Sequence, residues 1–127
     1  VALTLATRAP GATVWAVDVN ERARALTAAN AASAGLRNVR VTAPDQVPDD
    51  VAFAAVWSNP PVRVGKASLH ELLTTWLGRL SAAGTATLVV QKHLGADSLH
   101  RWLEGEGWAV ERLASRMGYR VLQVRAA

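Results

Sequence analysis

Apolar and polar positions along this chain form two kinds of pattern, which alternate. Four runs rich in Val and Ala predict buried β-strands, at residues 13–18, 39–43, 52–57 and 85–91. Between them, an Ala-rich run over residues 21–34, closed by Gly35, predicts a helix. Residues 66–80 predict another, because apolar side chains recur there every three or four positions. This alternation predicts an α/β fold with a mostly parallel sheet and helices on both faces.

The two ends of the chain add further elements. Residues 1–11 read as the end of a helix that stops at Pro10 and Gly11. A further helix is expected over residues 96–106, where Asp97 suits the N-terminus. Strands at 109–114 and 119–124 are separated by a short connection that contains Gly118, which predicts a C-terminal antiparallel hairpin.

The loop after the third predicted strand carries the most specific chemistry. Asn59, Pro60, Pro61 and Val62 follow an apolar run directly, and the prolines stiffen the backbone in an extended form. The Asn59 side-chain oxygen and the Pro60 carbonyl could accept both hydrogens of an exocyclic NH2 group, leaving its lone pair aimed at an electrophile. The alternative is an ordinary turn that ends a strand. Four of the five tryptophans are expected in the core, whereas Trp57 could wall a pocket beside this loop.

Asp18 ends the first predicted strand. A carboxylate at the carboxyl end of a parallel strand can accept hydrogen bonds from both hydroxyls of a cofactor ribose. Alternatively, Asp18 caps the helix that follows.

Ordered motifs extend over nearly the whole chain: residues 15–23, Asn30 with 35–39, Asp45, 58–62 with Gly65 and Lys66, 89–92, 94–99 and 118–122. Together they resemble the class I S-adenosylmethionine-dependent methyltransferases, and specifically the small-domain family that includes ribosomal RNA guanine-N2 methyltransferases. The resemblance implies a Rossmann-like methyltransferase sheet that is mostly parallel and ends in an antiparallel hairpin. It also implies S-adenosyl-L-methionine as the cofactor.

The same resemblance implies roles for individual residues. The cofactor ribose would be held by Asp18, with Val19 and Asn20 beside it. The adenine amine would be held by Asp45, with Gln46 beside it. Asn59, in the loop that receives the target base, would also contact the cofactor. For Asp45 the alternative is a plain Asx turn. Catalysis would rest on Asn59 and Pro60. The substrate would contact the residues that follow: Pro61, Val62, Arg63 and Lys66.

Two features depart from the family pattern. The glycine-rich loop and the central first strand should precede Val1, so we expect an upstream segment and, without it, two unpaired strand edges. Val62 stands where many members carry an aromatic residue that stacks on the target base. We interpret this as a change in substrate handling, and a vestigial pocket is the alternative.

Composition limits the classes of function. The 127 residues, half of them hydrophobic, suit one domain over residues 1–127, incomplete at its N-terminus. The chain has no cysteine, and its three histidines are scattered, so we expect no disulfide and no metal site. No apolar run approaches the roughly 20 residues that span a bilayer, and we see no signal peptide, so we expect no membrane partner and a cytoplasmic protein.

The charge favours a polyanionic partner. Fourteen Lys and Arg against ten Asp and Glu give a net charge of +4. Arg63 and Lys66 lie beside the proline loop, and six further basic residues lie late in the chain: Lys92, Arg101, Arg112, Arg116, Arg120 and Arg125. They could hold RNA phosphates, or they could simply be a solvated face.

The main hypothesis is therefore a methyltransferase acting on an exocyclic amine, most plausibly guanine N2 of ribosomal RNA. A second hypothesis keeps the chemistry but takes a protein glutamine amide or a small amine as the acceptor. A third is a non-catalytic RNA-binding or scaffold domain of the same fold. A nicotinamide-dependent oxidoreductase would also suit Asp18, but the chain has no G-x-G-x-x-G motif and that class does not explain the proline loop.

Overall fold

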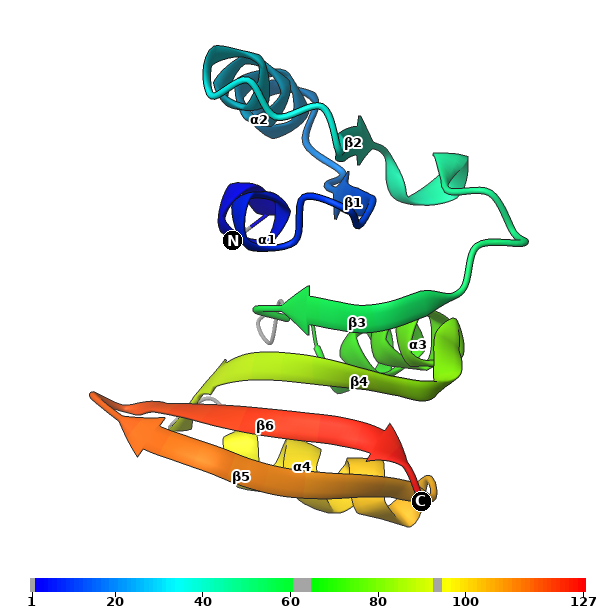
Figure 1. The fold of residues 1–127 in the computed structure, drawn as a ribbon. Helices are drawn as coiled ribbons and strands as arrows, with labels where there is room; N and C mark the ends of the chain where they lie inside the picture. Colours follow the sequence, from blue (N-terminus) through cyan, green and yellow to red (C-terminus); the bar gives the residue numbers. More distant parts are fainter. Residues whose placement is uncertain (1, 61–64, 93–94) are drawn as a thin grey trace. The chain divides into compact units, whose positions relative to one another are not determined.

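The computed structural model describes residues 2–60, 65–92 and 95–127. It divides into two compact units, a first unit of residues 1–51 and a second unit of residues 52–127 (Figure 1). That the whole chain is one domain stays a prediction. Among the described helices, none is both long and apolar enough to cross a membrane.

The first unit consists of two helices, two strands and a 3-10 turn: α1 (Ala2–Arg8), β1 (Val14–Val17), α2 (Glu21–Ser33), β2 (Val39–Thr42) and η1 (Pro44–Gln46). The strands β1 and β2 pair in parallel, with Val14 opposite Val39 and Val17 opposite Thr42. The parallel pairing confirms the pattern read from the two Val-rich runs.

A single asparagine holds the end of α1. The Asn38 side-chain amide lies 3.1 Å from the carbonyl oxygens of Ala6 and Ala9 and 2.9 Å from that of Ala12, and donates to them. The Ala6 carbonyl lies in the last turn of α1, where carbonyls lack a partner within the helix, and Ala9 and Ala12 lie in the turn that follows. Asn38 therefore ties α1 and the turn after it to the start of β2.

The second unit is a four-stranded sheet with two helices: β3 (Phe53–Ser58), α3 (Lys66–Leu77), β4 (Leu80–Gln91), α4 (Ala96–Gly105), β5 (Trp108–Arg116) and β6 (Tyr119–Ala126). The strand order is β3-β4-β6-β5; β3 is parallel to β4, and the other two pairings are antiparallel. The predicted C-terminal hairpin is confirmed, and both its strands are longer than predicted.

One helix boundary was predicted wrongly. The helix predicted over residues 66–80 ends at Leu77, and Leu80 begins β4, where it pairs with Phe53. The register slips between Phe53 and Ala55, and Gly84 lies at this irregularity. A Cβ at Gly84 would lie 2.8 Å from the Phe53 carbonyl oxygen, so glycine permits the close approach of the two strands.

Both helices of the second unit cover the same face of its sheet (Figure 1). The core between them consists of buried aliphatic side chains from α3, α4, β4 and β6: Leu69, Leu73, Leu77, Ala86, Leu88, Val90, Ala96, Leu99, Leu103, Leu122 and Val124. β3 pairs with β4 and packs its partly buried Val56 against this core, which sets the position where Asn59 follows β3.

The prediction that four tryptophans lie in the core is wrong, because Trp15, Trp76, Trp102 and Trp108 are all only partly buried. Trp102 and Trp108 pack against the core, and the Trp76 ring is 6.2 Å from that of Phe53. Trp57 is 50% exposed, as suits a residue outside the core. Its proposed place in the wall of a pocket stays a prediction.

Four strands have an open edge within the described residues. β1 and β2 pair only with each other, and β3 and β5 are the outer strands of the second sheet. The open edges of β1 and β3 are among the unpaired edges expected from the sequence.

Candidate functional site

The carboxyl ends of β1 and β2 bring the two predicted cofactor acids to one edge of the first unit. The Asp18 backbone N–H donates to the Thr42 carbonyl oxygen at 3.2 Å, which extends the parallel pairing by one residue. Asp45 follows Thr42 closely, in η1, and both carboxylates are exposed. Exposed carboxylates beyond adjacent parallel strands can accept hydrogen bonds from a polar ligand.

In the loop after β1, one residue caps α2 and another stays available to a ligand. The Asn20 side-chain oxygen accepts from the Ala23 N–H at 3.0 Å and caps α2, so the alternative that Asp18 is the cap is wrong. One Asp18 carboxylate oxygen accepts from the Asn20 N–H at 2.9 Å. The other accepts no hydrogen bond from the described residues, so it is available to a ligand hydroxyl. Because the Asn20 oxygen is engaged in the cap, its amide nitrogen is the group that remains for the predicted cofactor contact.

Arg24 holds the loop after β1 in place, a role that the sequence did not predict. Its guanidinium Nη1 donates to the carbonyl oxygens of Asp18 at 2.9 Å and Val19 at 3.0 Å. The backbone next to the free carboxylate oxygen is therefore fixed before any ligand binds. No signal in the sequence singles it out, because Arg22 lies equally near the start of α2 and is exposed.

Val19 is 80% exposed beside the Asp18 carboxylate. A large apolar side chain in solvent next to a hydrogen-bonding carboxylate suits a ligand with a polar sugar and a flat apolar ring. This arrangement agrees with the cofactor roles predicted for Asp18 and Val19, which stay predictions.

The turn η1 presents Asp45 and Gln46. The Gln46 N–H donates to the Ala43 carbonyl oxygen at 3.1 Å, and the Thr42 hydroxyl lies 3.5 Å from the Gln46 side-chain oxygen. The Asp45 carboxylate accepts no hydrogen bond from the described part of the chain. It therefore does not form the Asx turn that was the alternative reading.

The proline loop begins at the carboxyl end of β3 in the second unit. Ser58 pairs with Leu88, Asn59 is exposed and Pro60 is buried. An exposed amide anchored by a buried proline suits a side chain that must present its oxygen to a ligand. The predicted substrate residues Pro61, Val62 and Arg63 lie outside the described residues, so their contacts stay predictions.

Lys66 is exposed at the first position of α3. Gly65 precedes it with φ of 100°, a conformation that residues other than glycine rarely adopt. That Lys66 contacts the substrate stays a prediction. The predicted residues form two half-sites, one in each unit, and their union into one site stays a prediction.

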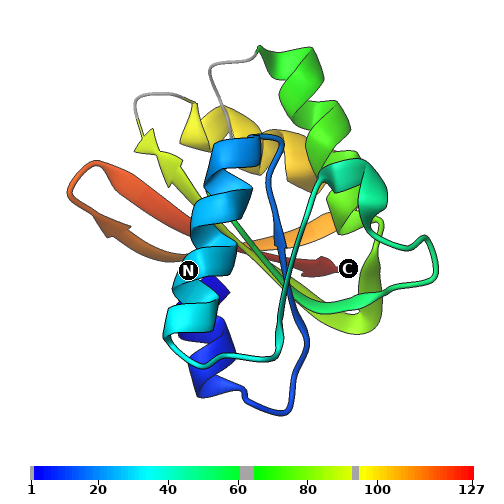
Figure 2. The same ribbon diagram turned by 90° about the horizontal axis from the view of Figure 1, so that it is seen from above.

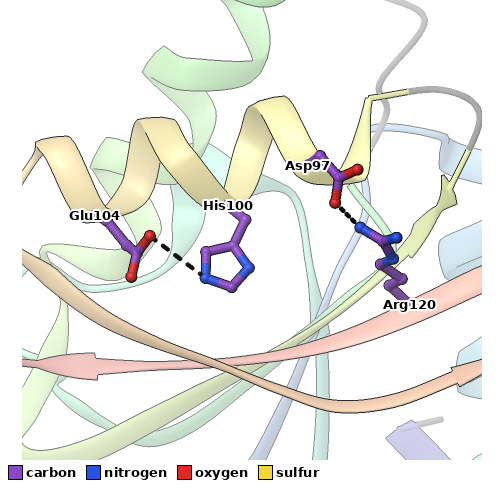
Figure 3. A network of polar contacts seen from close by, with 4 residues as sticks. All are labelled: Asp97, His100, Glu104 and Arg120. Atoms are coloured by element: carbon purple, nitrogen blue, oxygen red, sulfur yellow. Dashed lines mark ion pairs between the residues drawn. The ribbon is translucent and has the colours of Figure 1, made fainter.

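Arg120 does not belong to an exposed basic surface, contrary to expectation. It is 9% exposed on β6, opposite Val90, and pairs with Asp97 in the first turn of α4 (Figure 3). Its Nε has no hydrogen-bond partner among the described residues. The cause is strand alternation, because Arg120 shares the helix-covered face with Leu122 and Val124. The other late basic residues, Lys92, Arg101, Arg112, Arg116 and Arg125, are exposed.

No three His, Cys, Asp or Glu side chains come together as a possible metal ligand set within the described residues.

Comparison with known proteins places this geometry in a family. The model of the methyltransferase small domain matches residues 1–123. The uncharacterized protein YbxB of Bacillus subtilis is 32% identical over 128 residues, which cover 98% of this chain and 64% of that protein. The chain thus spans just under two thirds of this relative's length.

Solved structures share the fold. A precorrin-6y C5,15-methyltransferase from Geobacter metallireducens superposes with a TM-score of 0.78 at 16% identity, over 98% of this chain and 73% of that one. The 16S rRNA N2 G1207 methyltransferase RsmC of T. thermophilus, solved with AdoMet and guanosine, gives 0.68 at 18% identity, over 88% of this chain and 29% of that one. The fold is the Rossmann-like methyltransferase fold, and the chain belongs to the methyltransferase small domain family.

Proposed function

We propose that this chain transfers a methyl group from S-adenosylmethionine to an exocyclic amine, namely guanine N2 of ribosomal RNA. The observation that carries the proposal is the exposed Asn59, followed by the buried Pro60, at the carboxyl end of parallel strand β3. The likeness to RsmC, the 16S rRNA N2 G1207 methyltransferase, supports this choice of acceptor.

The first half-site would hold the cofactor. The free Asp18 oxygen would accept from the ribose hydroxyls, the exposed Val19 would contact the adenine face, and Asp45 would accept from the adenine amine. The cofactor, when bound, supplies a sulfonium methyl group. The hydrogen bonds within the loop leave the Asp18 carboxylate little to reorganise on binding.

The second half-site would hold the acceptor. The Asn59 side-chain oxygen and the Pro60 carbonyl would each accept one amine hydrogen, which directs the nitrogen lone pair. The nitrogen then forms a bond to the methyl carbon as the carbon–sulfur bond breaks, and one amine proton leaves to solvent. Positioning supplies the catalysis in this scheme, and no side chain is assigned as a general base.

A small-molecule acceptor is the second candidate, and the precorrin-6y C5,15-methyltransferase neighbour favours it, because the same fold there serves a substrate that is not RNA. A protein glutamine amide, a non-catalytic RNA-binding role and a cytoplasmic location stay predictions. The excess of basic residues favours RNA over an uncharged small molecule.

Replacing Asn59 with Ala tests the proposal. We expect methyl transfer from radiolabelled S-adenosylmethionine to purified ribosomal RNA or ribosomal subunits to fall about 100-fold, because the amine loses an orienting acceptor. Affinity for S-adenosylhomocysteine, measured by calorimetry, should change less than about threefold.

The control is Asn30→Ala, which makes the same side-chain change at an exposed position of α2. It should leave turnover unchanged. Equal losses of turnover and cofactor affinity in Asn59→Ala would show that Asn59 mainly supports the loop, and unchanged turnover would refute the catalytic role.

A further inference from the structure

The turn of the β5–β6 hairpin contains a residue that its turn type disfavours. Arg116 pairs with Tyr119, and the two residues between them, Met117 and Gly118, have φ of 51° and 82°. Two positive φ angles define a type I′ turn, which favours Asn, Asp or Gly at both positions. Met117 is the one non-glycine residue with positive φ in the described chain, and this conformation costs roughly 1 kcal/mol.

Within the described residues, no packing of the Met117 side chain offsets the energetic cost of its backbone conformation. Met117 is 92% exposed, so its side chain gains almost no packing. An exposed apolar side chain in a strained conformation is destabilising on two counts. Features of this kind occur where a surface has another use.

The residues around Met117 form a prepared contact surface. The Tyr119 hydroxyl accepts from Gln91 Nε2 at 3.0 Å, which fixes a ring that is 39% exposed. The Lys92 N–H donates to the Gly118 carbonyl oxygen at 2.7 Å, which holds this lysine beside the turn. We define the hairpin tip as Lys92, Arg116, Met117 and Tyr119; both charged members are exposed cations.

The hairpin tip lies at the end of the sheet that carries the catalytic asparagine. β3 and β4 run in parallel towards this end, from which the turn projects (Figure 1 and, from above, Figure 2). Ser58 is opposite Leu88, and Gln91 is opposite Tyr119. With strands about 4.8 Å apart and a rise of about 3.3 Å per residue, Tyr119 lies roughly 14 Å from Ser58. About four stacked nucleotides span that distance.

We propose that the hairpin tip binds the RNA strand that flanks the methylated nucleotide. Arg116 and Lys92 would contact phosphates, while the fixed Tyr119 ring and the Met117 thioether would contact base faces. The inference rests on the proposed function for its choice of RNA. Within the described residues neither cation forms an ion pair, which favours a polyanion over a protein segment of mixed charge.

Met117→Asn distinguishes RNA binding at the hairpin tip from a strained turn that has no function, because the two interpretations predict different outcomes. Asn suits the turn, so the Tm should rise by a few degrees. At the same time the dissociation constant for a fluorescein-labelled 20-nucleotide single-stranded RNA, measured by anisotropy, should increase at least threefold. Tyr119→Leu should weaken binding about tenfold, whereas Tyr119→Phe, which keeps the ring, should weaken it less than threefold.

Leu113→Asn is the matched control, because Leu113 is 50% exposed on β5 away from the turn. It should change RNA binding less than twofold. A Met117→Asn protein with a raised Tm and unchanged RNA affinity would overturn the proposal. A wild-type protein that binds no RNA would also overturn it. If the tip variants then impaired methylation of a protein acceptor, the hairpin tip would be a protein-docking site.

Binding of S-adenosylhomocysteine, measured in parallel, keeps the two proposals apart. Tip variants with weak RNA binding and normal cofactor binding would support the inference. RNA binding that depends on the tip, in a wild-type protein that binds no cofactor, would contradict the proposed reaction and leave the RNA surface standing.

Discussion

Asp18, Val19 and Asn20 divide three tasks among adjacent positions. Asn20 caps α2, Asp18 keeps one carboxylate oxygen free, and Val19 exposes an apolar side chain. The strand-ending carboxylate was predictable from its position after an apolar run. The division of tasks was not, because Asp and Asn are about equally good helix caps and only the hydrogen bonds decide between them.

Arg24→Leu tests whether this loop is organised in advance. Loss of the guanidinium frees the Asp18 and Val19 carbonyls, so the carboxylate must be ordered at the moment of binding. We expect affinity for S-adenosylhomocysteine to fall about 3- to 10-fold in calorimetric titration.

Arg22→Leu removes the same charge from an exposed position of the same helix and should leave affinity within twofold. Equal losses in the two variants would point to net charge in place of loop geometry. In an Asp18→Ala background the Arg24 effect should largely disappear, since both residues act through one contact.

At the scale of elements, an ion pair adds to the buried side chains that hold α4 against the sheet. Asp97 was expected to suit the helix N-terminus, and it does lie in the first turn, but its carboxylate pairs with Arg120 of β6 (Figure 3). Because Arg120 is 9% exposed, its cation depends on this partner. The exposed contact of His100 with Glu104, at 3.5 Å within α4, has no such importance.

Asp97→Ala should lower the free energy of unfolding by about 1–3 kcal/mol, measured by urea denaturation, because a mostly buried guanidinium loses its counter-charge. Adding Arg120→Met should recover much of that loss. Glu104→Ala, which removes the exposed pair, should cost less than about 0.5 kcal/mol. A loss in Asp97→Ala no larger than in Glu104→Ala would contradict the dependence of Arg120 on Asp97.

The boundary errors also belong to this scale. Leu80 continues the three- and four-residue spacing of α3 and yet begins β4. Apolar spacing alone cannot distinguish one more helical turn from the start of a buried strand. The hairpin was predictable because a short connection with glycine between two strand-like runs has few other solutions.

At the scale of the whole molecule, the charge excess makes a test of the acceptor class. If about three cations contact RNA phosphates, the logarithm of the association constant should fall with a slope of about −2 against the logarithm of salt concentration. RNA affinity would then decrease roughly 20-fold between 50 and 200 mM salt. Affinity for S-adenosylhomocysteine should hardly change over that range, and an RNA response equally flat would favour a small-amine acceptor.

Much of the molecule was determined by the sequence alone. The order of helices and strands, the carboxylate after β1, the Asn-Pro-Pro segment after β3 and the closing hairpin each follow from a few neighbouring residues, because periodicity and turn chemistry act locally. These features sufficed for the resemblance to the family.

The tertiary structure alone decided the contacts between distant or competing groups. Asn38 reaches three carbonyls of α1 and the turn after it, Arg24 holds the Asp18 loop, and Arg120 is buried against Asp97. Each of these polar side chains could equally have been solvated, and no local pattern distinguishes the two outcomes. Burial and long-range hydrogen bonding settle them, since a polar group withdrawn from water needs a partner that only the folded chain supplies.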